Sequence, residues 1–225
     1  MSLTRRLFLL SSAFAATLVG RQAMAQSATL PASANGYGAM PLSEALLRRE
    51  SVRTYDKAPI EDPQLLALLW AANGVNRPDV DGRTAPSWRT AKDTEIYVAR
   101  ASGVDHFDPV ANSLVQVSTD DIRKATSPQP FVGAAPVVLI YVTELSRLLK
   151  AAGLDETSFD AVTEDHRIAA HVNAAVIAQN VYLFCAAEGL GTCLVGGADR
   201  AATTAALGLT AGQLVTYVQP VGHIA

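Results

Sequence analysis

The sequence is poor in cysteine, in aromatic residues and in charge. Of 225 residues only 2 are Cys, aromatic residues make up 6% and charged residues 17%. Two cysteines cannot build a disulfide scaffold, and no Cys and His residues have the spacing of a structural zinc site, so we expect no metal. The hydrophobic content of 49% is enough to bury a sizeable core, which excludes a disordered chain. The length favours one domain.

Basic charge is also scarce over most of the chain. Arg5, Arg6 and Arg21 are three of the 18 basic residues, and no acid precedes residue 26. The remaining chain therefore has 15 basic and 21 acidic residues, a net charge of −6. Sequence-independent nucleic-acid binding needs clustered Lys and Arg to neutralise phosphates, so we expect no nucleic-acid partner.

Residues 1–25 have the pattern of a signal peptide. Arg5-Arg6 precede a short apolar run, and Ala23-Met24-Ala25 forms a small-residue cleavage site. The run is short for a permanent membrane anchor. The pattern Thr-Arg-Arg-Leu-Phe-Leu resembles a twin-arginine motif, although ordinary secretory signals also carry paired arginines. We expect cleavage after Ala25 and a periplasmic or otherwise exported protein.

The mature chain is predicted to have a flexible lead-in, 26–40, and one domain, 41–225. Helices and strands follow one another without a regular βαβ rhythm, which predicts an α+β fold. Residues 75–93 are predicted to be a long loop. The predicted helices are 41–49, 61–74, 165–188 and 199–208; the predicted strands are 95–99, 136–142, 194–195 and 214–218, with a hairpin over 103–118.

The helix over 165–188 has apolar or small residues on more than one face, which indicates a core contact together with a subunit interface. The residues predicted to face the core are Ile168, His171, Val172, Ala175, Ile177, Ala178, Val181, Tyr182 and Cys185. The residues left for the interface are Ala169, Ala170, Ala174, Val176 and Phe184.

The segment Arg49-x-Ser51-x-Arg53 places two guanidinium groups and a hydroxyl on one side of an extended chain. Such donors suit a phosphate monoester. An isolated pattern of this kind is more typical of a solvated basic turn that pairs with Glu50 and Asp56.

Two further segments have the composition of ligand-binding loops. Residues 84–91 concentrate hydroxyls, a Trp and an Arg before a strand, which suits a planar ring but also an ordinary surface turn. Residues 189–197 contain four glycines, which permit close approach of main chain to a ligand. A helix cap and a tight turn explain Gly189 and Gly191, but they explain Gly196-Gly197 less well.

In combination and order, these features resemble the nitroreductase family of FMN-dependent oxidoreductases along essentially the whole mature chain. The hairpin over 103–118 looks most like the branch of dehydrogenases that form thiazoles and oxazoles in modified peptides. The resemblance implies an α+β sandwich with a mixed, mainly antiparallel central sheet flanked by helices, and an intertwined homodimer with FMN between the subunits. The matching motifs are Arg49-x-Ser51-x-Arg53-x-Tyr55, Pro86-Ser87, Ala135-Pro136, Ala178-Gln179-Asn180-Val181-Tyr182-Leu183, Gly189-Leu190-Gly191-Thr192-Cys193 and Pro220-Val221-Gly222-His223.

The same resemblance implies roles for individual residues. Those implied to hold the FMN phosphate and ribityl chain are Arg49, Ser51 and Arg53, and those implied to contact the isoalloxazine are Ser87, Thr90, Leu194, Gly196 and Gly197. The chain departs from the family's pattern at Thr90, where Asn is frequent, at Lys92, where Gln is frequent, and after the Pro-Val-Gly segment, where many members supply Lys or Arg.

The sequence therefore predicts an exported FMN-dependent oxidoreductase that transfers hydride to or from a small organic substrate, with no catalytic side chain assigned because the flavin performs the chemistry. The alternatives are a non-enzymatic flavin or tetrapyrrole binder on the same scaffold and a structural domain without ligand. Export would separate the protein from NADH and NADPH, so we expect the substrate itself, a membrane redox protein or a quinol to supply electrons. His171 is predicted to be a satisfied core histidine, and Cys185 and Cys193 are predicted to be unpaired.

Overall fold

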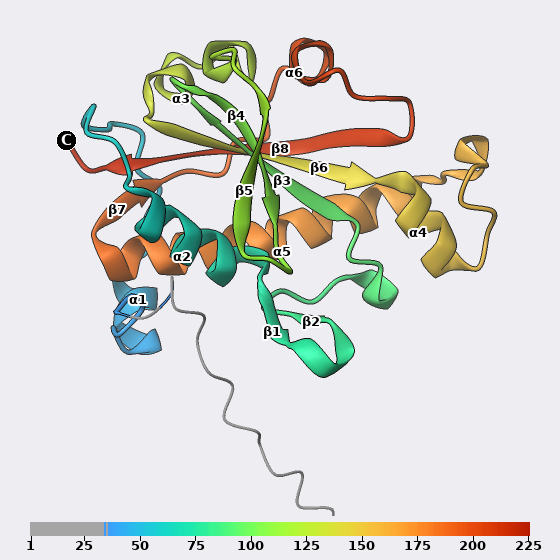
Figure 1. The fold of residues 1–225 in the computed structure, drawn as a ribbon, viewed down its shortest axis with the longest axis horizontal. Helices are drawn as coiled ribbons and strands as arrows, with labels where there is room; N and C mark the ends of the chain where they lie inside the picture. The colour runs from blue at the N-terminus through green and yellow to red at the C-terminus, as the bar shows by residue number, and fades with distance from the viewer. Residues whose placement is uncertain (1–33, 35) are drawn as a thin grey trace, which may run out of the picture.

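The computed structural model describes residue 34 and residues 36–225, so the predicted signal peptide and most of the predicted lead-in lie outside the described residues. A six-stranded sheet, in the order β5-β4-β3-β6-β8-β7, forms the centre of the fold (Figure 1). Every pair of neighbouring strands in it is antiparallel. Its strands are β3 (Thr94–Arg100), β4 (Gly103–Asp108), β5 (Ser113–Ser118), β6 (Val137–Glu144), β7 (Leu190–Thr192) and β8 (Gln213–His223).

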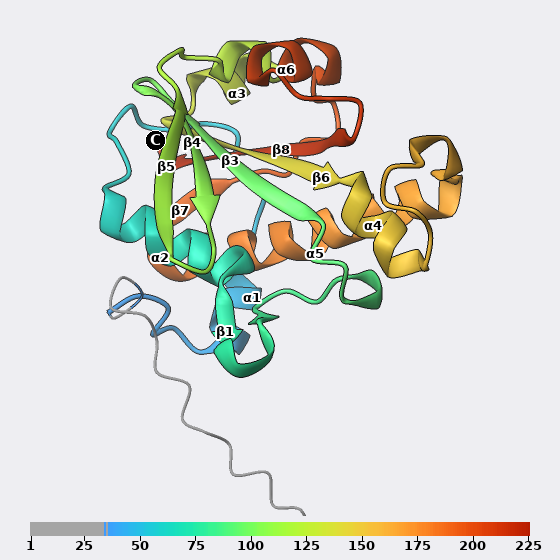
Figure 2. The ribbon, with the colours of Figure 1, turned by 45° about the vertical axis from the view of Figure 1, so that its right-hand side comes forward.

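Helices cover both faces of this sheet. Figures 1 and 2 show α5 and α2 lying along one face, α3 and α6 on the other, and α1 beside one end of α5. This arrangement confirms the predicted α+β sandwich, and the sheet is antiparallel throughout. The helices are α1 (Leu42–Arg48), α2 (Asp62–Asn73), α3 (Pro130–Ala134), α4 (Leu145–Ala152), α5 (Glu164–Glu188) and α6 (Arg200–Leu207).

Two layers of apolar side chains hold the sandwich together. Strand β6 is the nearly continuous apolar run of the sequence, and its residues 137–143 are all buried because helices lie over both of its faces. Ile96, Leu139 and Tyr141 face α2 and α5, whereas Val138 and Ile140 face α3 and α6. The sheet therefore forms the rigid floor against which α5 is placed.

Most of the predicted elements are present at nearly the predicted bounds, including the hairpin over 103–118. The predicted long loop is more ordered than expected, because it contains a small two-stranded sheet, β1 (Val75–Arg77) with β2 (Gly82–Arg83). Helices α3 and α4 were not predicted. The apolar spacing of Leu145, Leu148 and Leu149, all of them buried, is the pattern that would have indicated α4.

The prediction of which residues of α5 face the core was right for Ile177, Ala178, Val181 and Cys185, which are buried, and wrong for the first half of the helix. Ile168 and Val172, expected in the core, are 52% and 53% exposed. The buried side instead includes Ala169, Ala170, Ala174 and Phe184, which were expected at an interface. Helix α5 is long and apolar enough to cross a membrane, yet half of that apolar stretch is buried inside the protein, as in a core helix. A stripe of exposed and half-buried residues remains, which we call the outward stripe; it consists of Ile168, His171, Val172, Ala175, Gln179 and Tyr182.

Candidate functional site

The segment 49–53 lies against β7 in an extended conformation, directly after α1. The Val52 amide donates to the Thr192 carbonyl at 2.9 Å. Gly191 permits this approach, because a Cβ at that position would lie 2.7 Å from a Val52 methyl group. With Val52 turned toward β7, the alternation of side chains leaves Ser51 and Arg53 exposed and Arg49 half-buried.

Arg49 and Arg53 contact aromatic rings, and within the described residues neither forms a salt bridge. The Arg49 guanidinium lies 5.6 Å from the centre of the Tyr182 ring, and that of Arg53 lies 6.0 Å from the centre of the Phe131 ring. The predicted pairing of this segment with Glu50 or Asp56 is therefore not found. Two guanidinium groups keep donors available for an anion.

Tyr182 connects the predicted residues of this region, and the sequence analysis assigned it only to the helix core. Its hydroxyl oxygen accepts a hydrogen bond from the Leu194 amide at 2.8 Å and lies 3.0 Å from the Ser51 hydroxyl. Its ring supports Arg49. The motif that contains Tyr182 was recognised, but its contacts depend on residues that are distant in the sequence.

The Gly196-Gly197 pair exposes main chain next to this cluster. Both glycines are exposed, and the Ser127 hydroxyl donates to the Gly197 carbonyl at 3.0 Å. A Cβ at Gly197 would lie 2.8 Å from the side-chain amide of Gln129, so a larger residue would displace that side chain. At Gly196 a Cβ would have room, since its nearest neighbour, a Tyr217 ring carbon, would lie 3.9 Å away.

The segment 87–92 forms the other part of the predicted site and has a strained backbone. Arg89, Thr90 and Lys92 have φ angles of 48°, 55° and 49°, in the left-handed region that is unfavourable for β-branched or long side chains. Within it, the Lys92 amide donates to the Ser87 hydroxyl at 2.9 Å, and the Thr90 hydroxyl donates to the Arg89 carbonyl at 2.6 Å. Asn adopts this conformation more readily than Thr does, so Thr90, at a position where the family frequently has Asn, adds backbone strain.

Helix α5 links the two parts. The Trp88 amide donates to Asn173 of α5 at 2.8 Å, whereas Ser51 and Leu194 contact Tyr182 of the same helix. Nine residues separate Asn173 from Tyr182, which corresponds to about 14 Å along the helix axis. Tyr182 lies on the outward stripe, whereas Asn173 is buried on the other side of the helix, so the two parts contact different sides of α5.

His171, on the outward stripe, is not the satisfied core histidine that was predicted. It is half-buried against the edge of the Tyr217 ring, 5.0 Å between ring centres, and its Nδ1 has no partner within the described residues. Burial, together with the Arg200 charge, lowers the pKa of His171. His166 instead closes the start of α5 in a capping box with Thr163.

The two cysteines are buried and unpaired, as predicted. Burial raises the pKa of the Cys185 thiol well above its usual range, so Cys185 remains a thiol at physiological pH. Neither cysteine is exposed to a ligand on the outward stripe.

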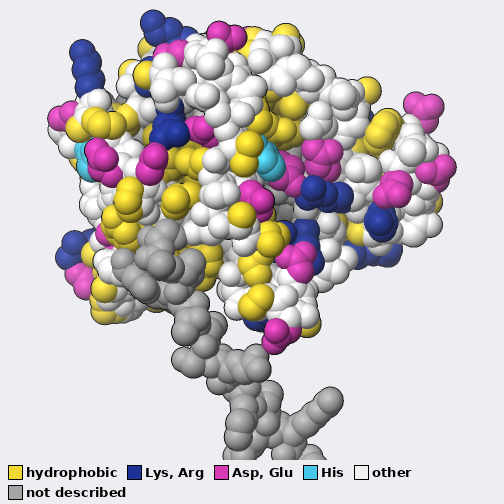
Figure 3. Space-filling model, in the orientation of Figure 1, with side chains coloured by type: hydrophobic (Ala, Val, Ile, Leu, Met, Phe, Trp, Pro, Cys, Tyr) yellow, Lys and Arg dark blue, Asp and Glu magenta, His cyan; other side chains and the backbone are white. Residues whose placement is uncertain are grey.

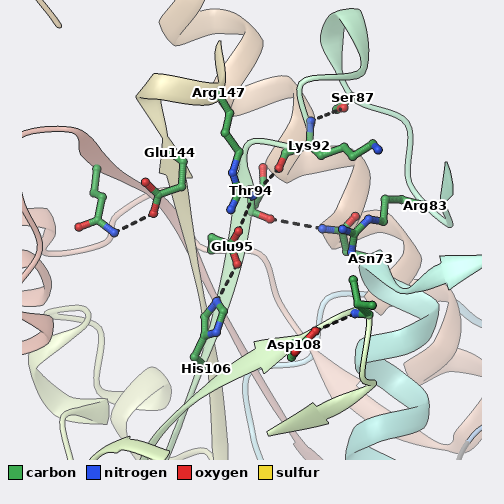
Figure 4. A network of polar contacts seen from close by, with 12 residues as sticks. Asn73, Arg83, Ser87, Lys92, Thr94, Glu95, His106, Asp108, Glu144 and Arg147 are labelled. Atoms are coloured by element: carbon green, nitrogen blue, oxygen red, sulfur yellow. Dashed lines mark hydrogen bonds and ion pairs between the residues drawn. The ribbon is translucent and has the colours of Figure 1, made fainter. Parts of the chain in front are cut away.

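A separate hollow of about 750 Å³ lies on the opposite face of the sheet and was not predicted. Its polar side chains are largely paired with one another: Glu95 lies 2.6 Å from His106 and 2.5 Å from Arg147 (Figure 4). Lys92 forms an ion pair with Asp81 at 2.8 Å. Figure 3 shows acidic and basic side chains interspersed on this face, without a patch of one sign. The hollow therefore offers no concentrated charge comparable to Arg49 and Arg53.

The fold and the two segments held by α5 define an α+β protein with a pair of arginines available to an anion. The comparisons name the family. Residues 46–223 match the model of the nitroreductase family, and the chain therefore belongs to the nitroreductase family, which supports an oxidoreductase. The motifs from 49–53 to 220–223 fall within this range.

Individual relatives agree with this assignment. A "putative nitroreductase" of Methanocaldococcus jannaschii is 32% identical over 166 residues, 69% of this chain and 78% of that protein. A solved "putative nitroreductase" from Ralstonia eutropha JMP134 is 33% identical with a TM-score of 0.74, covering 83% of this chain and 84% of its own. The NADPH:FMN oxidoreductase of Vibrio harveyi, 19% identical with a TM-score of 0.58 and covering 81% and 68%, shows likeness of fold alone.

Proposed function

We propose that this protein is an FMN-dependent oxidoreductase that transfers hydride to or from a small organic substrate. The observation that carries the proposal is the pair of arginines without salt bridges, Arg49 and Arg53, on either side of Ser51, whose hydroxyl lies 3.0 Å from that of Tyr182. Arginine forms bidentate, charge-assisted bonds to phosphate, so the donor set fits a phosphate monoester.

The rest of the surface fits a flat ring and a linking chain. The exposed main chain of Gly196 and Gly197 and the segment 87–92 would contact the ring, while Tyr182 joins Leu194 to Ser51 of the phosphate donor set. When bound, the flavin would supply reversible hydride transfer, and the protein would supply binding and orientation. The Ser87 hydroxyl accepts a hydrogen bond from the Lys92 amide, so its hydrogen can still be donated to a ring. The Thr90 hydroxyl donates to the Arg89 carbonyl, so its oxygen can still accept from a ring.

The purified mature protein provides the test. We expect a yellow protein with a flavin absorbance spectrum that bleaches with dithionite and recovers when a nitroaromatic compound or quinone is added. A flavin that reoxidises no faster than free FMN under the same conditions would identify a non-enzymatic binder. Colourless protein that takes up no added FMN would overturn the proposal.

We further propose that the protein is a homodimer in which the outward stripe is covered by the partner. Ile168 and Val172 on α5 and Leu47 on α1 are 52%, 53% and 85% exposed, a large apolar area for the surface of a soluble monomer. We expect light scattering to give twice the chain mass at micromolar concentration. Val172→Glu should shift the mass toward the monomer, whereas Val80→Glu, also at an exposed valine but distant on β1–β2, should not. A monomer with flavin bound would contradict the dimer.

Export remains part of the proposal, through the twin-arginine pattern of residues 1–25. A folded protein could then carry FMN across the membrane, but NADH and NADPH would not be available to it. We therefore propose that the substrate itself, as in the thiazole- and oxazole-forming dehydrogenases, or a membrane redox protein or quinol reduces the flavin. Stopped-flow reduction of the mature protein should be slow with NADH and NADPH; reduction at tens per second with micromolar affinity would refute this choice of donor.

A further inference from the structure

The strained segment 87–92 is held from below by a chain of hydrogen bonds through buried groups. The Trp88 amide donates to Asn173 Oδ1 at 2.8 Å, and Asn173 Nδ2 donates to Asp93 Oδ1 at 2.6 Å. Asp93 directly follows the segment, and Asn173 lies 80 residues later on α5. A strained backbone persists only where its surroundings determine it from several sides, and these two bonds connect the beginning of the segment to its end.

Asp93 is an unusual residue for this position. It is fully buried, and its Oδ2 has no hydrogen-bond partner in the described part of the chain. Burial raises its pKa to about 6, and the Asn173 hydrogen bond and the Arg147 charge act in the opposite direction. Burying a carboxylate with one unsatisfied oxygen costs stability, so Asp93 is not placed there to stabilise the fold. What it does fix is the orientation of the Asn173 amide.

The groups around Asp93 come from several elements. Arg147 of α4 faces it and also donates to the Lys92 carbonyl at 2.8 Å (Figure 4). The Thr143 hydroxyl of β6 faces it, α5 contributes Asn173, and Arg83 of β2 lines the same cavity of about 10 Å³. Lys92, next in the chain, turns its ammonium group to Asp81. Among these groups, only Asn173 connects Asp93 to the start of the segment, because its side chain is hydrogen-bonded to both Asp93 and the Trp88 amide.

Resting on the flavin site proposed above, we propose that Asp93, acting through Asn173, is a positioning residue that holds the segment 87–92 in the conformation it presents to the flavin ring, and that ionisation of Asp93 strengthens this hold. An ionised acceptor makes a hydrogen bond roughly twice as strong as a neutral one. The segment should therefore be held best with charged Asp93, less well with a neutral acceptor, and worst with no acceptor.

Hydrogen exchange of the flavin-free protein tests the hold directly. The reporters are the amides of Trp88, Thr90, Ala91 and Lys92, each of which is hydrogen-bonded within or below the segment. At pH 7.5, Asp93→Ala should lower their protection roughly tenfold or more, the loss expected for a hydrogen bond to a charged group. Asp93→Asn should lower it only by a few fold, and Asn173→Ala should reproduce Asp93→Ala with little further loss in the double variant. Asp79→Asn, an exposed acid in the neighbouring turn, is the matched control and should change nothing.

Two comparisons separate positioning from a merely structural role. After correction for intrinsic exchange rates, protection of wild-type protein at pH 5 should fall to that of Asp93→Asn, whose own protection should not depend on pH. Asp93→Asn should also raise the urea midpoint of the whole domain at pH 7.5 while it loosens the segment. Unchanged protection in Asp93→Ala, or a pH dependence that persists in Asp93→Asn, would overturn the proposal.

Binding of FMN and of riboflavin, which lacks the phosphate, distinguishes this inference from the proposed function. Asp93→Ala should weaken both ligands by the same factor of about ten, because the segment contacts the ring. Wild-type protein that binds neither ligand would refute the flavin site, while the exchange measurements would still decide whether Asp93 holds the segment. Wild-type protein that binds both, with unchanged affinity in Asp93→Ala, would refute the positioning role alone.

Discussion

At one end of the proposed flavin site, Arg49 and Arg53 contact aromatic rings and form no salt bridge within the described residues; at the other end, Arg89, Thr90 and Lys92 adopt left-handed conformations next to a buried carboxylate. The guanidinium groups at the first end form no salt bridge within the described residues, and few contacts constrain their side chains. The second has little net charge and is constrained by Asn173 from below and by Arg147 from the side. An anion can be bound by flexible charged groups, whereas contact with a flat ring depends on a backbone that is fixed beforehand.

The comparison predicts that the two ends respond to different perturbations. Salt should weaken the arginine end, because its charges are exposed and screened. Changes of pH between about 5 and 7 should act on the strained end, because the buried carboxylate there titrates with a pKa of about 6.

The largest effect is expected for Arg53→Ala. Loss of a charge-assisted contact should cost about 2–3 kcal/mol, roughly a hundredfold in FMN affinity, with little effect on riboflavin. Isothermal titration at two salt concentrations measures it, and Lys57→Ala, an exposed cation nearby in the sequence, serves as the control. An Arg53→Ala protein that binds FMN with unchanged affinity would remove Arg53 from the phosphate site.

Asp93→Asn should raise the free energy of unfolding at pH 7.5 by about 2 kcal/mol. Because burial raises the pKa of Asp93 from 3.8 to about 6, the folded state binds its proton more tightly than the unfolded state does. Ionised Asp93 therefore lowers the free energy of unfolding. This destabilisation is complete above pH 6, decreases as the pH falls from about 6 to about 4, and is absent below that range. Two pKa units correspond to about 3 kcal/mol, and relaxation around the charge reduces the expected gain.

Urea denaturation at pH 7.5 and at pH 4 measures this gain. The gain in the free energy of unfolding should be large at pH 7.5 and nearly absent at pH 4. The control Asp79→Asn should leave the free energy of unfolding unchanged at both pH values. An equal gain at the two pH values would mean that the substitution acts through packing rather than through ionisation.

Tyr182→Phe should have the smallest effect, about 1 kcal/mol in FMN affinity, or roughly fivefold. The ring under Arg49 remains, while the Leu194 amide and the Ser51 hydroxyl lose their shared partner. Tyr37→Phe, at a ring packed on Phe184, is the matched control. A loss as large as that of Arg53→Ala would show that Tyr182, rather than the guanidinium groups, dominates the phosphate end.

Local pattern was enough to predict the α+β class, the continuous apolar strand at 137–144, the hairpin over 103–118 and the bounds of α5 to within a residue. Each of these depends on the periodicity of neighbouring side chains or on a capping residue such as Gly189. The family could be recognised for a similar reason, since its motifs are short and the chain carries them in order.

Only the tertiary structure decided which side of α5 faces the sheet, because the helix has small or apolar residues all round and periodicity alone cannot orient it. It also decided that Tyr182 joins Ser51 to Leu194, and that Asp93 meets Asn173 across 80 residues of sequence. Contacts of that kind depend on how β3, β7 and α5 pack against one another, and no local pattern in 87–93 or 165–188 specifies that packing.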